Sequence, residues 1–143
     1  MTDRNILIIK NSWSHLIRQS DEAGSLFYDR LFELDPELKA MFPADIEAQA
    51  KKLMDMITFM VTNLQSMSGI KQDIESLAVR HASYGTRPQH YITVGSALIW
   101  VLEQSLGDLW NQETIQAWTS LYTMWSTAMI HAAEHGEEKR KGV

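Results

Sequence analysis

The stretch LAVRHASYG at residues 77–85 decides the fold, because it ends an apolar helical stripe with a histidine just before a turn. Ile70, Ile74, Leu77 and His81 are three or four residues apart, so they share one face of a helix. His81 therefore points toward the core among apolar neighbours. A lone histidine in such a place is more often a hydrogen-bonded core residue than a ligand, and this stretch alone leaves both interpretations open.

Length and composition indicate one globular domain without cysteine chemistry. The chain has 143 residues, of which 45% are hydrophobic and 22% charged, and these values are ordinary for a single folded domain with one core. It contains no cysteine, which excludes disulfides, zinc–thiolate sites, iron–sulfur clusters and thiol catalysis.

The sequence lacks the features of secreted, membrane-spanning and nucleic-acid-binding proteins. Its start, MTDRNILIIK, has neither the basic flank nor the long apolar centre of a signal peptide, and its longest apolar runs are too short to cross a bilayer. The net charge is −5, and the basic residues cluster only in EEKRK at residues 137–141. We expect a cytoplasmic protein, a monomer or homodimer, with no membrane or nucleic-acid partner.

Glycines and prolines separate segments of helical periodicity, and no segment between them alternates like a strand. Thr2 or Asp3 can cap the first helix, and Asp35 can cap a short one that Pro36 opens. The pattern predicts an all-α single domain over residues 1–143, with about seven helices and a frayed end at 136–143. The expected helices cover residues 2–20, 21–34, 35–43, about 45–64, 70–83, 88–107 and 111–135, with a break at 66–69 and a turn at 84–87.

The remaining histidines offer no complete metal site. His131 and His135 are four residues apart and could place two ligands on one helix face, but no third ligand accompanies them in the sequence. We expect them to be exposed polar residues near a helix end. His15 and His90 are isolated.

Over nearly its full length the chain resembles the globin family. LAVRHASYG…PQHYITVGSALIWVLE is similar to the proximal helix and the helix after it in bacterial single-domain haemoglobins, in the globin domain of flavohaemoglobins and in neuroglobin. SLFYDRLFELDPELKAMF resembles their second and third helices, QAKKLMDMITFMVTNL their distal helix and AWTSLYTMW their last helix. The resemblance implies a globin fold around a haem pocket, with haem b (iron protoporphyrin IX) as the cofactor.

The resemblance also assigns individual residues to the two sides of the haem. His81 matches the proximal histidine that binds the iron. Tyr28 matches the distal tyrosine, Gln49 the distal ligand-binding position and Leu53 the apolar position above the iron. Further contacts with the cofactor are expected from Phe42, which packs against the haem, from Lys52 and Arg80 near its propionates, and from Leu77, Tyr91 and Val94.

These residue types suit the binding of a diatomic gas. A neutral imidazole is a good iron ligand, and a single proximal histidine leaves the opposite axial position open. Tyr28 and Gln49 carry hydrogen-bond donors, and donors in a dry pocket stabilise the partial negative charge of bound dioxygen. Each has an alternative role: Tyr28 as a core aromatic residue and Gln49 as a surface residue near a helix start.

The chain departs from the family's pattern on the proximal side. Tyr91 lies where some bacterial members place a tyrosine in a network with the proximal histidine and a glutamate of the last helix. Here that glutamate position falls on Ala132 or Ala133, and Glu134 is offset. A carboxylate bonded to the proximal imidazole would raise its donor strength, so peroxidase-like activation of a ligand is in doubt.

The sequence thus predicts a haem-b globin that binds dioxygen, nitric oxide and carbon monoxide at an open axial position. Its task would be oxygen storage or delivery, or nitric-oxide dioxygenation. No flavin or nicotinamide domain follows in the chain, so turnover would need an external reductase. One alternative is a haem-based gas sensor acting through a separate partner. The other is a haem-free helical regulatory domain, against which His81 argues.

Overall fold

The computed structural model describes residues 1–18, 20–42 and 44–141, and this part of the chain is folded entirely into helices and short connections. The α-helices and 3-10 helices (η) are α1 Asp3–Ile17, α2 Ser20–Leu34, η1 Pro36–Met41, α3 Ile46–Thr62, η2 Leu64–Ile70, α4 Lys71–Ser83, α5 Pro88–Leu106, η3 Gly107–Leu109 and α6 Gln112–Lys141. The predicted all-α fold is confirmed, since six α-helices and η1 occupy the seven expected segments.

Local sequence explains where the helices begin and end. Thr2 caps α1 by accepting a hydrogen bond from the Asn5 amide, and Asp35 caps η1, which Pro36 opens as expected. The expected turn at 84–87 is present, and Gly85 adopts a φ of +88°, which costs glycine little because it has no Cβ.

Two boundaries differ from the sequence-based expectation. The expected break at 66–69 is the 3-10 helix η2, within which only Ser66 leaves the helical region, with a φ of −133°. The last helix was expected over residues 111–135 with a frayed end after it, and α6 continues through Gly136 to Lys141. A glycine inside a helix costs only ~1 kcal/mol, and the Glu, Lys and Arg residues after it favour helix.

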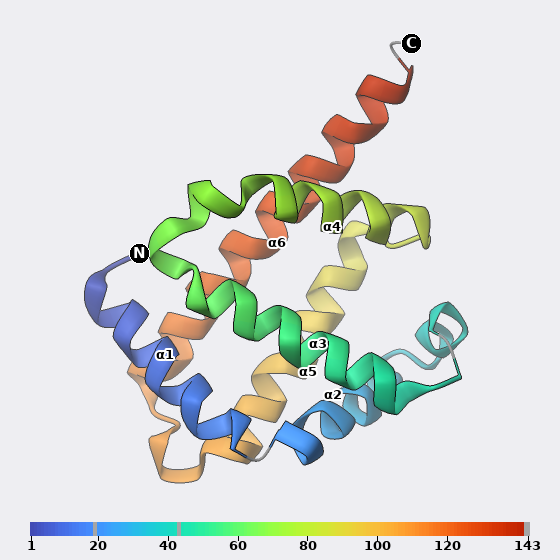
Figure 1. The fold of residues 1–143 in the computed structure, drawn as a ribbon. Helices are drawn as coiled ribbons and strands as arrows, with labels where there is room; N and C mark the ends of the chain where they lie inside the picture. The colour runs from blue at the N-terminus through green and yellow to red at the C-terminus, as the bar shows by residue number, and fades with distance from the viewer. Residues whose placement is uncertain (19, 43, 142–143) are drawn as a thin grey trace.

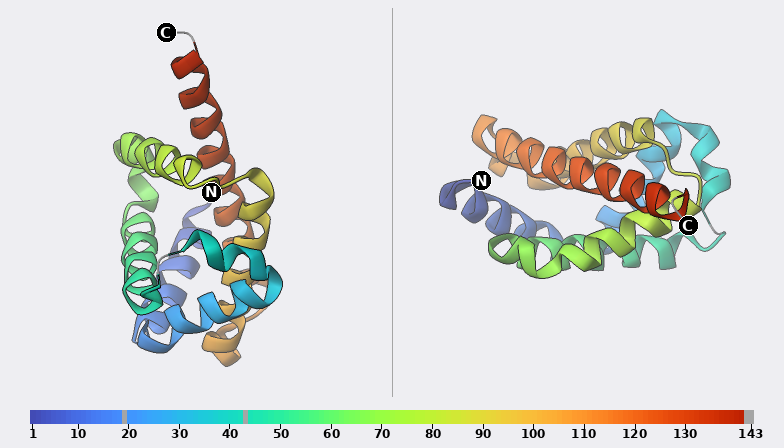
Figure 2. Two further views of the ribbon diagram at one scale, coloured as in Figure 1. Left: turned by 90° about the vertical axis from the view of Figure 1, so that its right-hand side faces the viewer. Right: turned by 90° about the horizontal axis from the view of Figure 1, so that it is seen from above.

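Two sets of helix contacts dominate the packing, and α1 and α5, which both contact α6, join them. α4 packs against α6, and α2 packs against both α3 and α5 (Figure 1). α3 and α5 lie on opposite sides of the molecule, with α2 at one end between them (Figure 2). Beyond α4, the C-terminal end of α6 projects from the body of the molecule in both figures. No helix in the described ranges is long and apolar enough to span a membrane.

Two tryptophans join α1 to the rest of the core. Trp13 and Trp118 are 3% and 0% exposed, and their ring centroids lie 5.9 Å apart. Trp13 donates a hydrogen bond to the Thr58 hydroxyl at 2.9 Å, and Trp118 donates to the Ser12 hydroxyl at 2.8 Å. Each buried indole N–H is therefore paired, as a buried donor must be to avoid a desolvation penalty.

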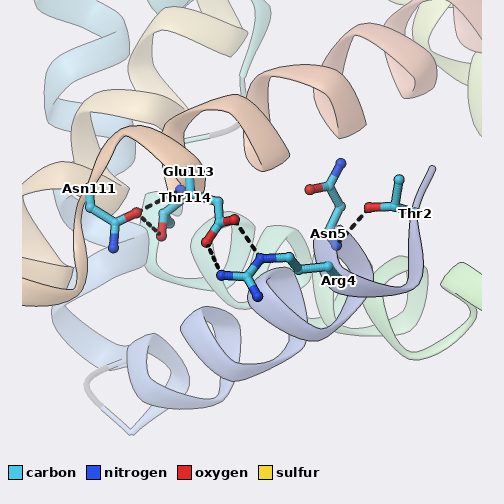
Figure 3. Close-up of polar contacts among 6 residues, drawn as sticks. All are labelled: Thr2, Arg4, Asn5, Asn111, Glu113 and Thr114. Atoms are coloured by element: carbon cyan, nitrogen blue, oxygen red, sulfur yellow. Dashed lines mark hydrogen bonds and ion pairs between the residues drawn. The ribbon is translucent and has the colours of Figure 1, made fainter.

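The N-terminal ends of α1 and α6 are joined at the surface (Figure 3). The Arg4 guanidinium binds the Glu113 carboxylate through two hydrogen bonds, one of them 2.8 Å long between Nη2 and Oε1. Asn111 caps α6 by accepting a 2.9 Å hydrogen bond from the Thr114 amide. Because Arg4 and Glu113 are largely exposed, we attribute only a small part of the stability to their ion pair.

The crossing of α2 and α3 depends on the absence of a side chain at Gly24. A Cβ atom at this position would lie 2.9 Å from the Cβ of Ala50, which is closer than two non-bonded carbon atoms approach in folded proteins. Tyr28 follows Gly24 by one helical turn, and Gln49 precedes Ala50. This close crossing therefore brings the two expected distal residues together.

We predict that Gly24→Ala lowers the free energy of unfolding. Overpacking costs roughly 1–3 kcal/mol, which exceeds the gain in helix propensity of about 1 kcal/mol. Urea denaturation measures the difference, and Gly69→Ala is the matched control because nothing lies within 4 Å of a Cβ at that glycine.

The same substitution made in an Ala50→Gly background should be neutral or stabilising, because the methyl group it meets has been removed. A Gly24→Ala effect of equal size in both backgrounds would show that this contact does not limit the crossing.

Candidate functional site

The His81 side chain is held in a defined orientation by its own helix. Its Nδ1 lies 2.8 Å from the backbone carbonyl oxygen of Leu77, one turn earlier in α4. A carbonyl accepts hydrogen bonds only, so Nδ1 carries the proton and the neutral imidazole keeps the lone pair on Nε2. This arrangement, in which one ring nitrogen donates to the backbone, is typical of metal-ligating histidines.

The surroundings of His81 favour the neutral imidazole. Burial lowers the pKa of His81, and the positive charge of Arg80 lowers it further. The hydrogen bond to Leu77 raises the pKa in part, but the result stays below the usual 6.5. At neutral pH the ring is therefore uncharged, which is the form that binds metals.

An aromatic cluster surrounds Tyr28 on α2. The Tyr28 ring meets Phe27 and Phe42 edge to face, with centroids 5.0 and 5.3 Å away, and lies 5.9 Å from Phe32. Phe32 and Phe42 also meet edge to face at 5.7 Å. These contacts fix the ring of Tyr28, which is only 3% exposed.

The hydroxyl of Tyr28 is buried beside the side chain of Gln49. Burial raises the pKa of Tyr28 to about 12, and hydrogen bonding with the Gln49 side chain lowers it in part. The phenol is consequently neutral at physiological pH and keeps its proton for donation. Gln49 is only half-buried, so one end of this polar pair reaches the solvent.

Five of the expected cofactor contacts share one type of environment. Each is a partly buried apolar or aromatic side chain that packs against the core from one side, as a pocket lining would; they are Phe42, Leu53, Leu77, Tyr91 and Val94. They come from the end of η1 and from α3, α4 and α5.

The two expected cations are both exposed, Lys52 on α3 and Arg80 on α4. Arg80 borders a cleft of about 110 Å³ between α3 and α4, which Leu77 and Met56 also line. Charged heads at the rim of an apolar cleft are in a position to meet carboxylates at the solvent boundary.

Tyr91 is fixed through its backbone. Its carbonyl oxygen accepts a hydrogen bond from the hydroxyl of Tyr122 on α6, and burial raises the pKa of its own phenol. Tyr122 fits against α5 because Gly95 lacks a Cβ, which would otherwise lie 2.8 Å from Cδ1 of that ring. Ala132 and Ala133 are half-buried and Glu134 is exposed, so the carboxylate expected from the family's pattern is indeed displaced from this position.

Phe32 lies one turn after Tyr28 on the same helix face, as helical spacing predicts, and its ring joins the cluster around that tyrosine. One feature was not anticipated from the sequence. The indole nitrogen of Trp125 is buried without a hydrogen-bond partner. Helical spacing in AWTSLYTMW indicates that Trp125 faces the core, but it carries no information on where an indole N–H points.

The donor set fits haem better than a metal held by protein alone. Within the described residues no group of three or more His, Asp or Glu side chains could hold an ion. A single imidazole with a fixed orientation suffices only where a macrocycle provides the other ligands, and the apolar lining and the cations at its edge suit such a macrocycle.

Comparison with known proteins decides the family. The family model described as Globin matches residues 25–129, which are most of the chain. The chain belongs to the globin family. The globin resembles neuroglobin of Tetraodon nigroviridis, with 29% identity over 148 residues that cover 92% of each chain. It is also 29% identical to neuroglobin of Dissostichus mawsoni over 155 residues, 97% of each chain.

Solved structures show the same fold. A bacterial globin from Campylobacter jejuni superposes with a TM-score of 0.86 at 24% identity, covering 96% of this chain and 99% of that one. A hexacoordinated heme protein from an anhydrobiotic tardigrade superposes with a TM-score of 0.85 at 14% identity, covering 94% and 96% of the two chains. As a globin, the chain is a haem-based binder of small gas ligands.

The buried Tyr28 phenol predicts a loss of stability at alkaline pH. Its pKa rises from about 10 in the unfolded chain to about 12 in the fold, so its contribution is complete below pH 10 and lost as the pH rises through 12. Two units correspond to about 2–3 kcal/mol. Urea denaturation at pH 8–12 should show a smaller decline for Tyr28→Phe than for the wild type. Equal declines would contradict the burial of a protonated phenol.

Proposed function

We propose that this globin binds haem b between α3 and α4, with His81 as the protein ligand of the iron, and that it binds dioxygen reversibly on the opposite side. The anchored imidazole of His81, whose Nδ1 lies 2.8 Å from the Leu77 carbonyl oxygen, is the observation that carries this proposal. The haem iron supplies the bond to the gas, and the chain supplies the hydrogen bonds that make this bond selective.

Gln49 leaves the distal side available for a gas. An imidazole binds iron strongly, whereas a neutral carboxamide offers only a weakly basic oxygen, so a glutamine at this position competes poorly with an external ligand. The half-buried Gln49 side chain can turn toward solvent and open a path for entry, while Tyr28 stays fixed by its aromatic neighbours.

The two donors favour dioxygen over carbon monoxide. Bound dioxygen carries partial negative charge and accepts hydrogen bonds, whereas bound carbon monoxide is much less polar. A net contribution of about 0.5–1.5 kcal/mol per hydrogen bond is enough to slow the escape of dioxygen several-fold. Nitric oxide is the third ligand that we expect at the same position.

The cellular task that follows is oxygen storage or delivery, or nitric-oxide dioxygenation. Nitrate forms when nitric oxide combines with dioxygen and one electron, so each turnover needs a reductase as electron donor. Ala132 and Ala133 stand where the family's pattern has the glutamate that would favour cleavage of the O–O bond, and we therefore do not propose peroxidase activity.

Lys52 and Arg80 complete the proposed site at its outer edge. Both are exposed, and Arg80 borders the cleft between α3 and α4. We propose that they pair with the two propionates of haem. Such solvent-exposed pairs contribute only ~0–1 kcal/mol each, so they orient the haem more than they retain it.

The ligand role of His81 predicts the result of its removal. His81→Gly should abolish haem retention or the normal ferrous spectrum, and added imidazole should restore the spectrum by filling the place of the side chain. Haem content and absorption spectra of the ferric, ferrous and carbonmonoxy forms test this. A His81→Gly protein with wild-type haem content and spectra, without imidazole, would refute it. His90→Gly is the control.

The donor role of Tyr28 predicts a change in dissociation rates. Tyr28→Phe should speed dioxygen release by up to roughly tenfold, because one hydrogen bond is lost, and should change carbon monoxide release much less. Gln49→Leu should have a smaller effect, because Gln49 is half-exposed. Stopped-flow measurements on the two variants and the wild type give these rates. If carbon monoxide release changes while dioxygen release does not, Tyr28 serves only as packing.

A further inference from the structure

We propose that His131 and His135 form a surface site that chelates a divalent transition metal such as Cu²⁺, separate from the haem pocket. The two imidazole rings lie on successive turns of α6 with their centroids 4.8 Å apart and their planes inclined by 34°. Both side chains are exposed.

The helix spacing suits a bidentate ligand, in which both histidines bind one ion. Side chains four residues apart stand one above the other on the same helix face, so the two rings can turn their nitrogens toward one ion. The α-helical backbone continues through His135 to Lys141, so this turn lies inside the helix and not at its last residues. The helix thus already holds the two rings within reach of one ion.

The donor chemistry selects the class of metal. Imidazole suits copper, zinc and nickel, whereas calcium and magnesium prefer oxygen ligands. Among divalent ions at a nitrogen site, copper binds most tightly. The exposed Glu134 carboxylate, three residues after His131, adds negative charge beside the pair. Two histidines occupy two positions of the ion and leave the others for water or further ligands.

The proposed site faces away from the core. Trp125 and Met129 are the buried residues of this part of α6, each 6% exposed. His131 instead ends a shallow groove on the outer face of the helix, which Thr123, Met124 and Thr127 also line. The Thr127 hydroxyl, one turn before His131, could accept a hydrogen bond from a metal-bound water. A metal here would leave the His81 side of the molecule unchanged.

A metal that bridges one helical turn would also stiffen the projecting part of α6. This end of the helix extends beyond α4 (Figure 1). An ion that binds only the helical form stabilises that form by mass action. Metal binding should therefore slow amide hydrogen exchange around residues 131–138 and leave α1–α3 unaffected.

Calorimetric titration of Cu²⁺ into the full-length ferric holoprotein, purified without a histidine tag, tests the proposal. We expect each wild-type chain to bind one more Cu²⁺ ion tightly than the His131→Gln/His135→Gln double variant does. Each single variant should weaken this binding by about tenfold or more, since even the loss of an outer-shell partner costs roughly that much. Zn²⁺ should occupy the same site more weakly.

The pattern across variants separates a chelate from two independent histidines. If the two histidines bind one Cu²⁺ ion together, either substitution alone, His131→Gln or His135→Gln, weakens that binding so that the tightly bound ion is lost. If each single variant keeps half of the binding with unchanged affinity, or if wild type and double variant bind alike, the proposal is wrong. His90→Gln is the matched control, because His90 lies on α5, where its Nδ1 accepts a 2.9 Å hydrogen bond from the Arg87 amide. The haem spectrum should be the same in all variants.

Discussion

The 2.8 Å contact between Nδ1 of His81 and the carbonyl of Leu77 is the constraint on which the account of this globin depends. It fixes the tautomer and the orientation of the ring, and burial keeps the imidazole neutral by lowering its pKa. The expected apolar cofactor contacts are partly buried against the core, and Arg80, which is exposed, borders the cleft between α3 and α4. Without an anchored imidazole these residues would be ordinary core and surface positions.

The distal side is built by a close helix crossing and not by the polar residues themselves. Gly24 lets α2 approach Ala50 of α3, and this approach sets Tyr28 beside Gln49. Three phenylalanine rings then hold the tyrosine in place. A rigid donor paired with a half-exposed one gives a site that can hold a polar ligand and still open to solvent. The site therefore depends on packing between helices as much as on its donors.

Sequence periodicity predicted the helices well, because apolar spacing and caps are local signals. Thr2, Asp35 and Pro36 mark the helix starts at which the structure places them. The last helix was predicted over residues 111–135 and α6 extends to Lys141, because the good helix formers after Gly136 outweigh the cost of that glycine. The site residues were assigned by resemblance and stay proposals, although the structure shows Tyr28 beside Gln49 and an anchored His81. The Leu77 contact, the role of Gly24 and the unpaired nitrogen of Trp125 depend on side-chain geometry that no local pattern encodes.

A crystal structure of the haem-bound protein with carbon monoxide would identify the residues on each side of the iron. We expect that Nε2 of His81 binds the iron, that Nδ1 remains bonded to the Leu77 carbonyl, and that Tyr28 and Gln49 lie on the opposite face with the gas. An iron held by any other side chain, or Tyr28 and His81 on the same face of the haem, would contradict this expectation.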